Sequence, residues 1–229
     1  MDFIYYFCSQ IKTYYDMKKI ILAAIVLAQT TITFAQNTWE MSEAERQEMI
    51  KVKPTLEAKY AEGAVPVVDG TVVFEKTFNA PGKSAKEIYD LIKGKLAEWV
   101  AEPNQIVTEG GARISNIVYD KPEESIIAAR FYEYLVFKKA ALVLDRTDFD
   151  FTLTATFKDG EATVKMSRLR YVYEKNRETG FNEPAENVIS DKYALTKKKD
   201  KLSRTYGKFR KKTIDRKEYI FQEFEKLLK

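Results

Sequence analysis

Histidine is absent from this sequence of 229 residues, and cysteine occurs only once, as Cys8. Without histidine, the chain cannot form a Ser-His-Asp triad, a Cys-His pair or a histidine-ligated metal site. One cysteine cannot supply the several thiolates that a zinc or iron–sulfur site needs. We therefore predict that the protein binds no metal and no cofactor and is not an enzyme.

Long apolar runs are also missing near the N-terminus. The run IILAAIVLA at 20–28 has nine residues, whereas a membrane-spanning helix needs about 20. Met17-Lys18-Lys19 precedes this run and QTTITFA follows it, which places Thr33 and Ala35 at the −3 and −1 positions before Gln36. This order is that of a secretory signal peptide. We predict export to the periplasm or cell envelope, or secretion, with no membrane span after cleavage.

Residues 1–16 stand ahead of a signal peptide that is already complete. We therefore expect translation to begin at Met17 and residues 1–16 to result from a misplaced start codon. The exported chain, 36–229, then contains no cysteine. Since it cannot form disulfides in an oxidising compartment, its stability has to come from packing alone.

Neither sign of charge dominates, because 38 Lys and Arg stand against 34 Asp and Glu. The distribution is nevertheless uneven, and 192–217 contains twelve basic residues and only two acidic ones. This segment could contact an anionic surface, such as phosphate-rich lipid headgroups or lipopolysaccharide. A solvated linker, which such runs usually form, is the favoured interpretation. The candidate contact residues are Lys197, Lys198, Lys199, Lys201, Arg204, Lys208, Arg210, Lys211 and Lys212.

The stretch 65–100 predicts a strand followed by a helix. Apolar residues at 72–74 and at Phe78 follow an Asp69-Gly70 turn, which is typical of a strand. After Pro81-Gly82, Ser84 and Glu87 form a capping box that begins a helix. Its apolar stripe consists of Ala85, Ile88, Leu91, Ile92, Leu96 and Trp99, at the spacing of an amphipathic helix.

Four further strands are predicted at 113–119, 125–137, 149–157 and 161–173. In 149–157, phenylalanine and other apolar residues alternate with aspartate and threonine, so one face is expected in the core and the other in water. Asp159-Gly160 predicts a two-residue hairpin. Continued pairing would bring Arg168 and Arg170 inside, so we predict a β-bulge near Ser167-Arg168. A last helix is predicted to begin at an Asp215/Glu218 capping box.

The predicted order of elements is therefore strand, helix, four strands and helix. This order indicates an α+β fold with one antiparallel sheet and helices packed on one face. We divide the chain into a signal peptide region at 1–35, an N-terminal helix and linker at 36–64, an α+β domain at 65–189, and a basic segment with a C-terminal helix at 190–229.

Several stretches resemble a known family. VPVVDGTVVFEKTF at 65–78, PGKSAKEIY at 81–89 and DKYALTKKKDKLSRTYGKFRKKTID at 191–215 resemble secreted bacterial proteins of unknown function, whose domain is described as having a TBP-like fold. The resemblance covers most of the exported chain and implies a TBP-like β-α-β4-α architecture. The family implies no activity, cofactor or catalytic residue. Nucleic acid is not expected as a partner, because fold alone does not imply DNA binding and export argues against it.

Two further patterns have competing interpretations. Residues 148–152 match D-x-D-x-T, which is similar to a phosphoryl-transfer signature of haloacid-dehalogenase-type enzymes. Here the motif lies inside an alternating strand, so a structural role is favoured. Tyrosines could form a binding patch on the sheet, although core packing is the favoured alternative. They are Tyr119, Tyr132, Tyr134, Tyr171 and Tyr173.

Taken together, the sequence predicts an exported, non-enzymatic binding or interaction module of the bacterial cell envelope. Its partner would be an envelope protein or an anionic surface. The alternatives are a hydrolase that uses carboxylates or a Ser/Lys pair, and a purely structural envelope component. A deep pocket with converging carboxylates would favour the hydrolase, whereas an uncovered aromatic sheet face would favour binding.

Overall fold

The computed structural model describes residues 38–39, 56–101, 105–108, 111–140 and 143–229. All of these residues belong to one compact unit, Gln36–Lys229. The predicted signal peptide region at 1–35 and residues 40–55 of the predicted N-terminal helix and linker lie outside the described residues. Among the described helices, none is long and apolar enough to cross a membrane.

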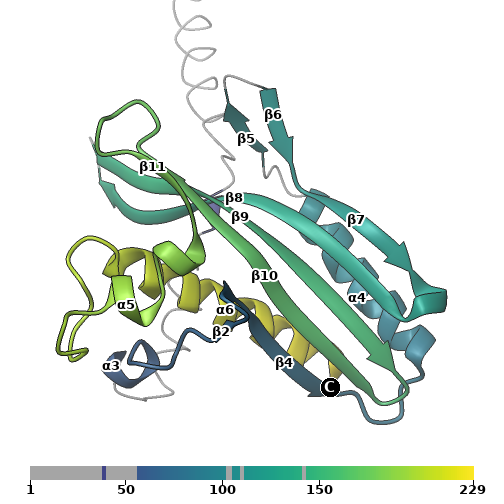
Figure 1. Ribbon diagram of the computed structural model, residues 1–229. Helices are drawn as coiled ribbons and strands as arrows, with labels where there is room; N and C mark the ends of the chain where they lie inside the picture. Colours follow the sequence, from purple (N-terminus) through teal and green to yellow (C-terminus); the bar gives the residue numbers. More distant parts are fainter. Residues whose placement is uncertain (1–37, 40–55, 102–104, 109–110, 141–142) are drawn as a thin grey trace, which may run out of the picture. The chain divides into compact units, whose positions relative to one another are not determined.

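The domain is built on a seven-stranded sheet with three long strands at its centre (Figure 1). Strands β8, β9 and β10 form consecutive antiparallel pairs. β7 and β1 pair with the outer side of β8, and β4 and β11 pair with the outer side of β10; only the β1 pairing is parallel. The bounds are β1 Thr38–Trp39, β4 Phe74–Asn79, β7 Asn116–Lys121, β8 Ile126–Ala140, β9 Val143–Lys158, β10 Glu161–Tyr173 and β11 Phe181–Pro184.

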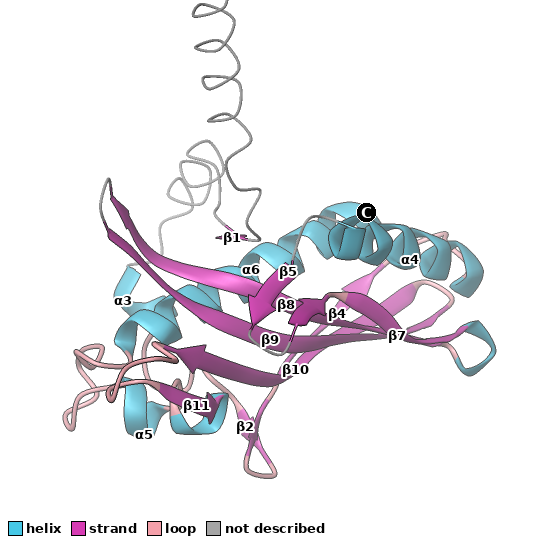
Figure 2. Ribbon diagram, turned by 90° about the horizontal axis from the view of Figure 1, so that it is seen from above, coloured by secondary structure: helices cyan, strands magenta, loops and turns pink. Residues whose placement is uncertain are grey.

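Two long helices pack on the same face of this sheet (Figure 2). They are α4, Ala85–Ala101, and α6, Gly207–Leu228. In Figures 1 and 2, no described helix covers the opposite side of β8 and β9, which is called the open face below. The smaller elements are α3 Leu56–Lys59, β2 Val67–Val68, β3 Thr71–Val72, β5 Gln105–Thr108, β6 Gly111–Ile114, η1 Pro122–Glu124, η2 Ala185–Asn187 and α5 Asp191–Ala194.

Helix α4 begins where the sequence predicts. The Ser84 backbone N–H donates to Glu87 Oε2 at 2.8 Å, and the Glu87 N–H donates to Ser84 Oγ at 3.3 Å. This reciprocal capping box satisfies two backbone donors at the helix start. The stripe of the helix that includes Ile88, Ile92 and Leu96 is buried against the sheet, so the predicted amphipathic helix is confirmed.

The core lies between the sheet and the two helices. Phe149, Phe151 and Leu153 of β9 are buried on this side, and burying such a side chain contributes roughly 1.5–3 kcal/mol. The Phe131 and Phe151 rings stack at 5.1 Å, and Trp99 of α4 meets Phe131 edge to face at 6.4 Å. The predicted order of strand, helix, four strands and helix, with an antiparallel core sheet and helices on one face, is confirmed by β4, α4, β7–β10 and α6.

The predicted β-bulge is present in β10. The register with β9 shifts between Ser167 and Arg170, and Arg168 adopts a φ of 55°. The extra residue turns Leu169 and Tyr171 into the core, where both are buried, and leaves Arg170 exposed. The bulge therefore resolves the conflict between the hairpin register and the positions of the arginines.

Three expectations are corrected. The open side of β9 is not fully exposed to solvent, because Asp148 and Asp150 are only 6% and 3% exposed, and Lys175 pairs with Asp148. The last helix starts at Gly207, well before Asp215, because buried Phe209 and Ile214 extend its apolar stripe. The predicted N-terminal helix and linker at 36–64 also contributes to the core, since its described part contains α3 and the buried Tyr60.

Candidate functional site

The basic segment does not form one continuous surface. Arg210 is completely buried, with 0% exposure, so this predicted contact residue cannot reach an anionic surface. Its guanidinium donates to the backbone carbonyl oxygens of Tyr60, Ala61 and Ile189 at 3.0, 2.5 and 2.8 Å. It also pairs with Asp191 Oδ1 at 2.7 Å. Arg210 therefore links α6 to two distant segments of the chain, 60–61 and 189–191.

Lys208 has internal partners as well. Its Nζ lies 2.8 Å from Asp145 Oδ2 and 2.8 Å from the Tyr173 hydroxyl. It also lies 4.6 Å from the centre of the Phe137 ring, within cation–π distance. Burial alone would lower the pKa of Lys208, but Asp145 and Tyr173 outweigh burial and raise it. The side chain is thus a charged link between α6 and the ends of β8–β10.

The other predicted contact residues lie nearer the surface. Lys197, Lys198 and Arg204 are exposed, and Lys212 is half-buried. Lys199, Lys201 and Lys211 are among the residues that line a cleft of about 440 Å³. The structure therefore brings only three of the nine candidates together, and it does so around a concavity rather than on a flat surface.

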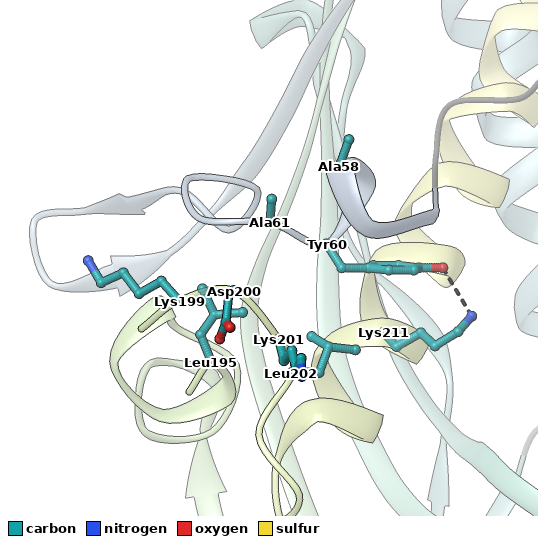
Figure 3. A pocket seen from close by; sticks show the side chains of 9 residues that line it. All are labelled: Ala58, Tyr60, Ala61, Leu195, Lys199, Asp200, Lys201, Leu202 and Lys211. Carbon is teal, nitrogen blue, oxygen red and sulfur yellow. Dashed lines mark hydrogen bonds between the residues drawn. The ribbon is translucent and has the colours of Figure 1, made fainter. Parts of the chain in front are cut away.

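This cleft lies between α3, the loop 195–202 and α6 (Figure 3). Figure 3 shows Tyr60 and Lys211 together on one side, and Lys199 extending away on the other. Its lining residues are Ala58, Tyr60, Ala61, Leu195, Lys199, Asp200, Lys201, Leu202 and Lys211. The cleft therefore combines apolar side chains with the side chains of three lysines.

Local hydrogen bonds shape the loop that forms one wall. The Thr196 N–H donates to the Lys201 carbonyl at 2.9 Å, and a β-bridge joins Leu195 to Leu202. The Thr196 hydroxyl donates to Asp200 Oδ1 at 2.7 Å. Gly207 lets Leu202 approach the start of α6, because a Cβ at this glycine would lie 2.7 Å from Leu202 Cβ. These contacts hold the two leucines at the cleft.

A charged network supports the opposite wall. Asp215 accepts hydrogen bonds from the Tyr60 hydroxyl and from Lys59 and Lys211, the two lysine contacts each measuring 3.1 Å. Burial raises the pKa of Tyr60, and Asp215 raises it further. Burial alone would also raise the pKa of Asp215, but Tyr60 and the two lysines outweigh it and lower that pKa. Tyr60 therefore stays neutral and Asp215 stays ionised at neutral pH.

The cleft wall also holds a contact between segments far apart in the sequence. The Lys199 ammonium pairs with Glu62, and 137 residues separate the two. The sequence interpretation identified Lys199, Lys201 and Lys211 as contact residues but missed Tyr60 and the apolar lining. No local pattern marks these residues, because the cleft forms only when 58–61 meets 195–211.

A second concave region lies on the open face. It is a groove of about 320 Å³ lined by Tyr134, Arg146, Asp148, Val172, Glu174, Lys175, Asn176 and Arg177. The Arg146 guanidinium lies 3.6 Å from the centre of the Tyr134 ring, and the Lys175 ammonium pairs with Asp148. The first aspartate of the D-x-D-x-T pattern thus has a lysine partner, as suits a structural role.

The five tyrosines of the predicted patch do not share one surface. Tyr171 is fully buried on the helix-covered side, and Tyr173 packs there against Phe209 at 5.3 Å. The strand register places the other three on the open face, namely Tyr119, Tyr132 and Tyr134. The predicted patch is therefore wrong for two residues, and three remain on the open face.

Comparisons with known proteins place this fold among uncharacterised relatives. The model of the domain of unknown function (DUF4468) with TBP-like fold matches residues 74–172. A crystal structure of a DUF4468 family protein from Bacteroides ovatus ATCC 8483 is 36% identical, with a TM-score of 0.66, over 75% of this chain and 94% of that one. No curated protein matches this chain.

A second solved structure supports the fold alone. It is a TBP-like protein from Parabacteroides distasonis ATCC 8503, which is 19% identical, with a TM-score of 0.55. The similarity covers 72% of this chain and 96% of that one. The matched family region contains the strands of the open face, whereas every residue that lines the cleft lies outside it.

Proposed function

The chain belongs to the DUF4468 family, whose domain of unknown function has a TBP-like fold, and we propose that it is an exported, non-enzymatic binding module of the bacterial cell envelope. The ligand that we propose is a small amphiphile with an apolar body and an acidic head group. It occupies the cleft between α3, the loop 195–202 and α6.

The composition of the cleft carries this proposal. Ligand sites usually have volumes of about 300–1,000 Å³ and apolar walls with a few polar groups, and the cleft of about 440 Å³ matches this description. Leu195 and Leu202 supply apolar surface for the body of the ligand. The Lys201 and Lys211 ammonium groups lie at the same cleft and can neutralise an acidic head group.

The charge of the surrounding loop favours the same class of ligand. Residues 196–201 contain four lysines and one aspartate, and the aspartate already accepts a hydrogen bond from Thr196. Each basic residue near an anionic lipid surface contributes about 1 kcal/mol. Free carboxylate amphiphiles and anionic lipid headgroups share this chemistry, so the experiment has to separate these two sources.

The carboxylates near the cleft support binding rather than hydrolysis. A general acid or base works best when its pKa lies near the working pH. The pKa of Asp215 is lowered below its ordinary value of 3.8, which moves it away from neutral pH. Tyr60 changes in the opposite direction, and its neighbours keep its hydroxyl protonated.

Export rests on the N-terminal pattern of basic, apolar and small residues before Gln36. Expression of the full sequence in a Bacteroides host, followed by cell fractionation and N-terminal sequencing, tests it. We expect the protein in the envelope fraction with Gln36 as its first residue. Recovery in the cytoplasm with an intact N-terminus would contradict export, and this result would leave the ligand proposal untouched.

Ligand binding is tested by calorimetric titration of the exported chain, 36–229, with decanoate. The variant Lys201→Gln/Lys211→Gln removes the two ammonium groups that are proposed to contact the head group, while Lys197→Gln/Lys198→Gln removes two from the loop 195–202 outside the lining. Two contacts of about 1 kcal/mol each correspond to a roughly 30-fold loss of affinity in the first variant. We expect less than a twofold change in the second.

Two further ligands distinguish the sources of the acidic group, and one further variant tests whether the cleft is the binding site. Inorganic phosphate lacks the apolar body and should bind far more weakly than decanoate, whereas vesicles of phosphatidylglycerol test a lipid headgroup. Ala58→Trp fills the cleft from α3 and should abolish decanoate binding. Equal losses in the two lysine variants, or unchanged binding by Ala58→Trp, would overturn the proposal.

A further inference from the structure

The open face carries tyrosine and arginine side chains in neighbouring rows. Cross-strand partners in an antiparallel sheet lie on the same face. Tyr132 of β8 is paired with Asp150 of β9, which is paired with Arg170 of β10. Two residues further along β8, on the same face, Tyr134 is paired with Asp148. The register therefore brings aromatic, acidic and basic side chains together across three strands.

Each tyrosine in these rows has an arginine beside its ring. The Arg130 guanidinium lies 4.8 Å from the centre of the Tyr132 ring, and that of Arg146 lies 3.6 Å from the centre of the Tyr134 ring. The Tyr132 backbone N–H also donates to Ser115 Oγ at 3.0 Å. Strand register and stacking thus hold the rings and guanidinium groups in place before any partner arrives.

The acidic and basic groups of the open face differ in their exposure to solvent. Asp148 and Asp150 are 6% and 3% exposed, whereas Arg130 and Arg170 are exposed. Arg170 donates to Asn182 Oδ1 of β11 at 2.6 Å, on the side of β10 away from β9. A partner that approaches the face therefore meets the exposed arginines, because both carboxylates are buried.

The adjacent groove extends the basic surface. Lys175 pairs with Asp148, and Arg177 pairs with Glu174 at 2.7 Å. Among the residues named in these rows and the groove, five are basic and three are acidic, and two of the acidic ones are buried. The five are Arg130, Arg146, Arg170, Lys175 and Arg177. Charge complementarity therefore favours an acidic partner.

We propose that the open face is a docking surface for an acidic segment of a partner protein. Tyrosine and arginine are enriched in protein–protein interfaces and among the residues that dominate their binding energy. The guanidinium group of arginine can bind a carboxylate through two parallel hydrogen bonds. This surface lies on the side of the sheet opposite α4 and α6, and its function does not depend on ligand binding in the cleft.

The test uses poly-L-glutamate as the probe and the exported chain, 36–229, as the protein. Arg130→Gln/Arg146→Gln/Arg170→Gln removes three positive charges from the open face. Lys197→Gln/Lys198→Gln/Arg204→Gln removes the same charge from exposed positions elsewhere. We expect at least a tenfold loss of affinity in the first variant and less than a twofold change in the second. Affinity should also fall as salt increases.

A second variant guards against misfolding, since removal of three arginines could expose the buried aspartates. Arg130→Gln alone changes one exposed side chain and should weaken poly-L-glutamate binding about threefold to tenfold while leaving the unfolding temperature unchanged. Unchanged affinity in both arginine variants, or an equal loss in the lysine-rich control, would overturn the docking surface. Equally tight binding of polygalacturonate, with the same dependence on the arginines, would overturn the assignment to a protein partner.

Discussion

The cleft and the open face both place tyrosine beside basic side chains, but they are assembled in different ways. On the open face, the neighbours belong to adjacent strands, and the sheet register brings them together. At the cleft, the walls come from segments on either side of the family domain, and 137 residues separate Glu62 from Lys199. A surface set by strand register can be traced in a sequence, whereas a cleft made by distant segments cannot.

The largest change in unfolding free energy is expected from a buried ion pair that joins α6 to β8. Arg216 of α6 donates to Glu133 of β8 through two contacts of 2.8 and 2.9 Å, and both side chains are buried. Glu133→Ala leaves the guanidinium without this partner and should cost about 3–5 kcal/mol of unfolding free energy. Chemical denaturation measures it.

The matched control for this pair is the double variant Glu133→Leu/Arg216→Met. Replacing a buried ion pair by apolar side chains is often neutral, so the double variant should be more stable than Glu133→Ala. If the losses in Glu133→Leu and Arg216→Met alone add up to the loss in the double variant, the two residues do not act as a unit.

The next effect separates the two regions. Arg210 holds the Tyr60–Ala61 backbone against α6, so Arg210→Met should cost about 3 kcal/mol and disturb the cleft. We expect decanoate binding to weaken at least tenfold and poly-L-glutamate binding to stay within twofold of the wild type. Parallel losses of both activities in the folded variant would show that the two regions are not independent.

A smaller effect concerns pH and again distinguishes the cleft. The folded pKa of Asp215 is lowered below 3.8 by Tyr60, Lys211 and Lys59, despite burial. A lowered folded pKa stabilises the protein above the unfolded value, and this contribution is lost as the pH falls below about 4. Asp215→Asn should therefore be about 1–2 kcal/mol less stable than the wild type at pH 7.

The stability difference between the wild type and Asp215→Asn should shrink as the pH drops below 3.8. Urea unfolding of the two proteins at pH 7, 5 and 3 measures it. Arg177→Gln is a useful comparison, because it removes an exposed ion pair from the open face and should leave the pH profile unchanged. A constant gap at all three values would contradict the role of the Asp215 carboxylate.

The smallest effect is expected on the open face. Arg146 stacks on Tyr134 at 3.6 Å, and a cation–π contact of this kind contributes about 0.5–1 kcal/mol near a surface. Arg146→Gln should therefore lower stability by no more than about 1 kcal/mol, while Arg146→Lys should retain part of the contact. A loss above 3 kcal/mol, measured by the same denaturation, would mean that this arginine is a core residue rather than part of a docking surface.

Much of the fold could be predicted because its determinants are local. Ser84 and Glu87 identify the start of α4, and Asp159-Gly160 sets the β9–β10 hairpin. The conflict at Arg168 was enough to predict the bulge. The start of α6 was placed too late, because the apolar residues Phe209 and Ile214 lie within a run of basic ones.

The sites were predicted less well for a physical reason. Basic composition identified Lys199, Lys201 and Lys211, but it gave Arg210 the same role although that residue is buried. Composition does not reveal which charges find internal partners. On the open face, the i, i+2 spacing of Arg130, Tyr132 and Tyr134 was a usable signal, since alternate residues of a strand share a face.

The most direct test of the account is a nuclear magnetic resonance titration of the isotope-labelled chain 36–229. Decanoate should shift the backbone resonances of Tyr60, Leu195 and Leu202 and leave those of Tyr132 and Tyr134 unchanged. Poly-L-glutamate should produce the reverse pattern. Shifts by both ligands at the same residues, or decanoate shifts confined to the open face, would contradict the claim that the domain has two separate binding regions.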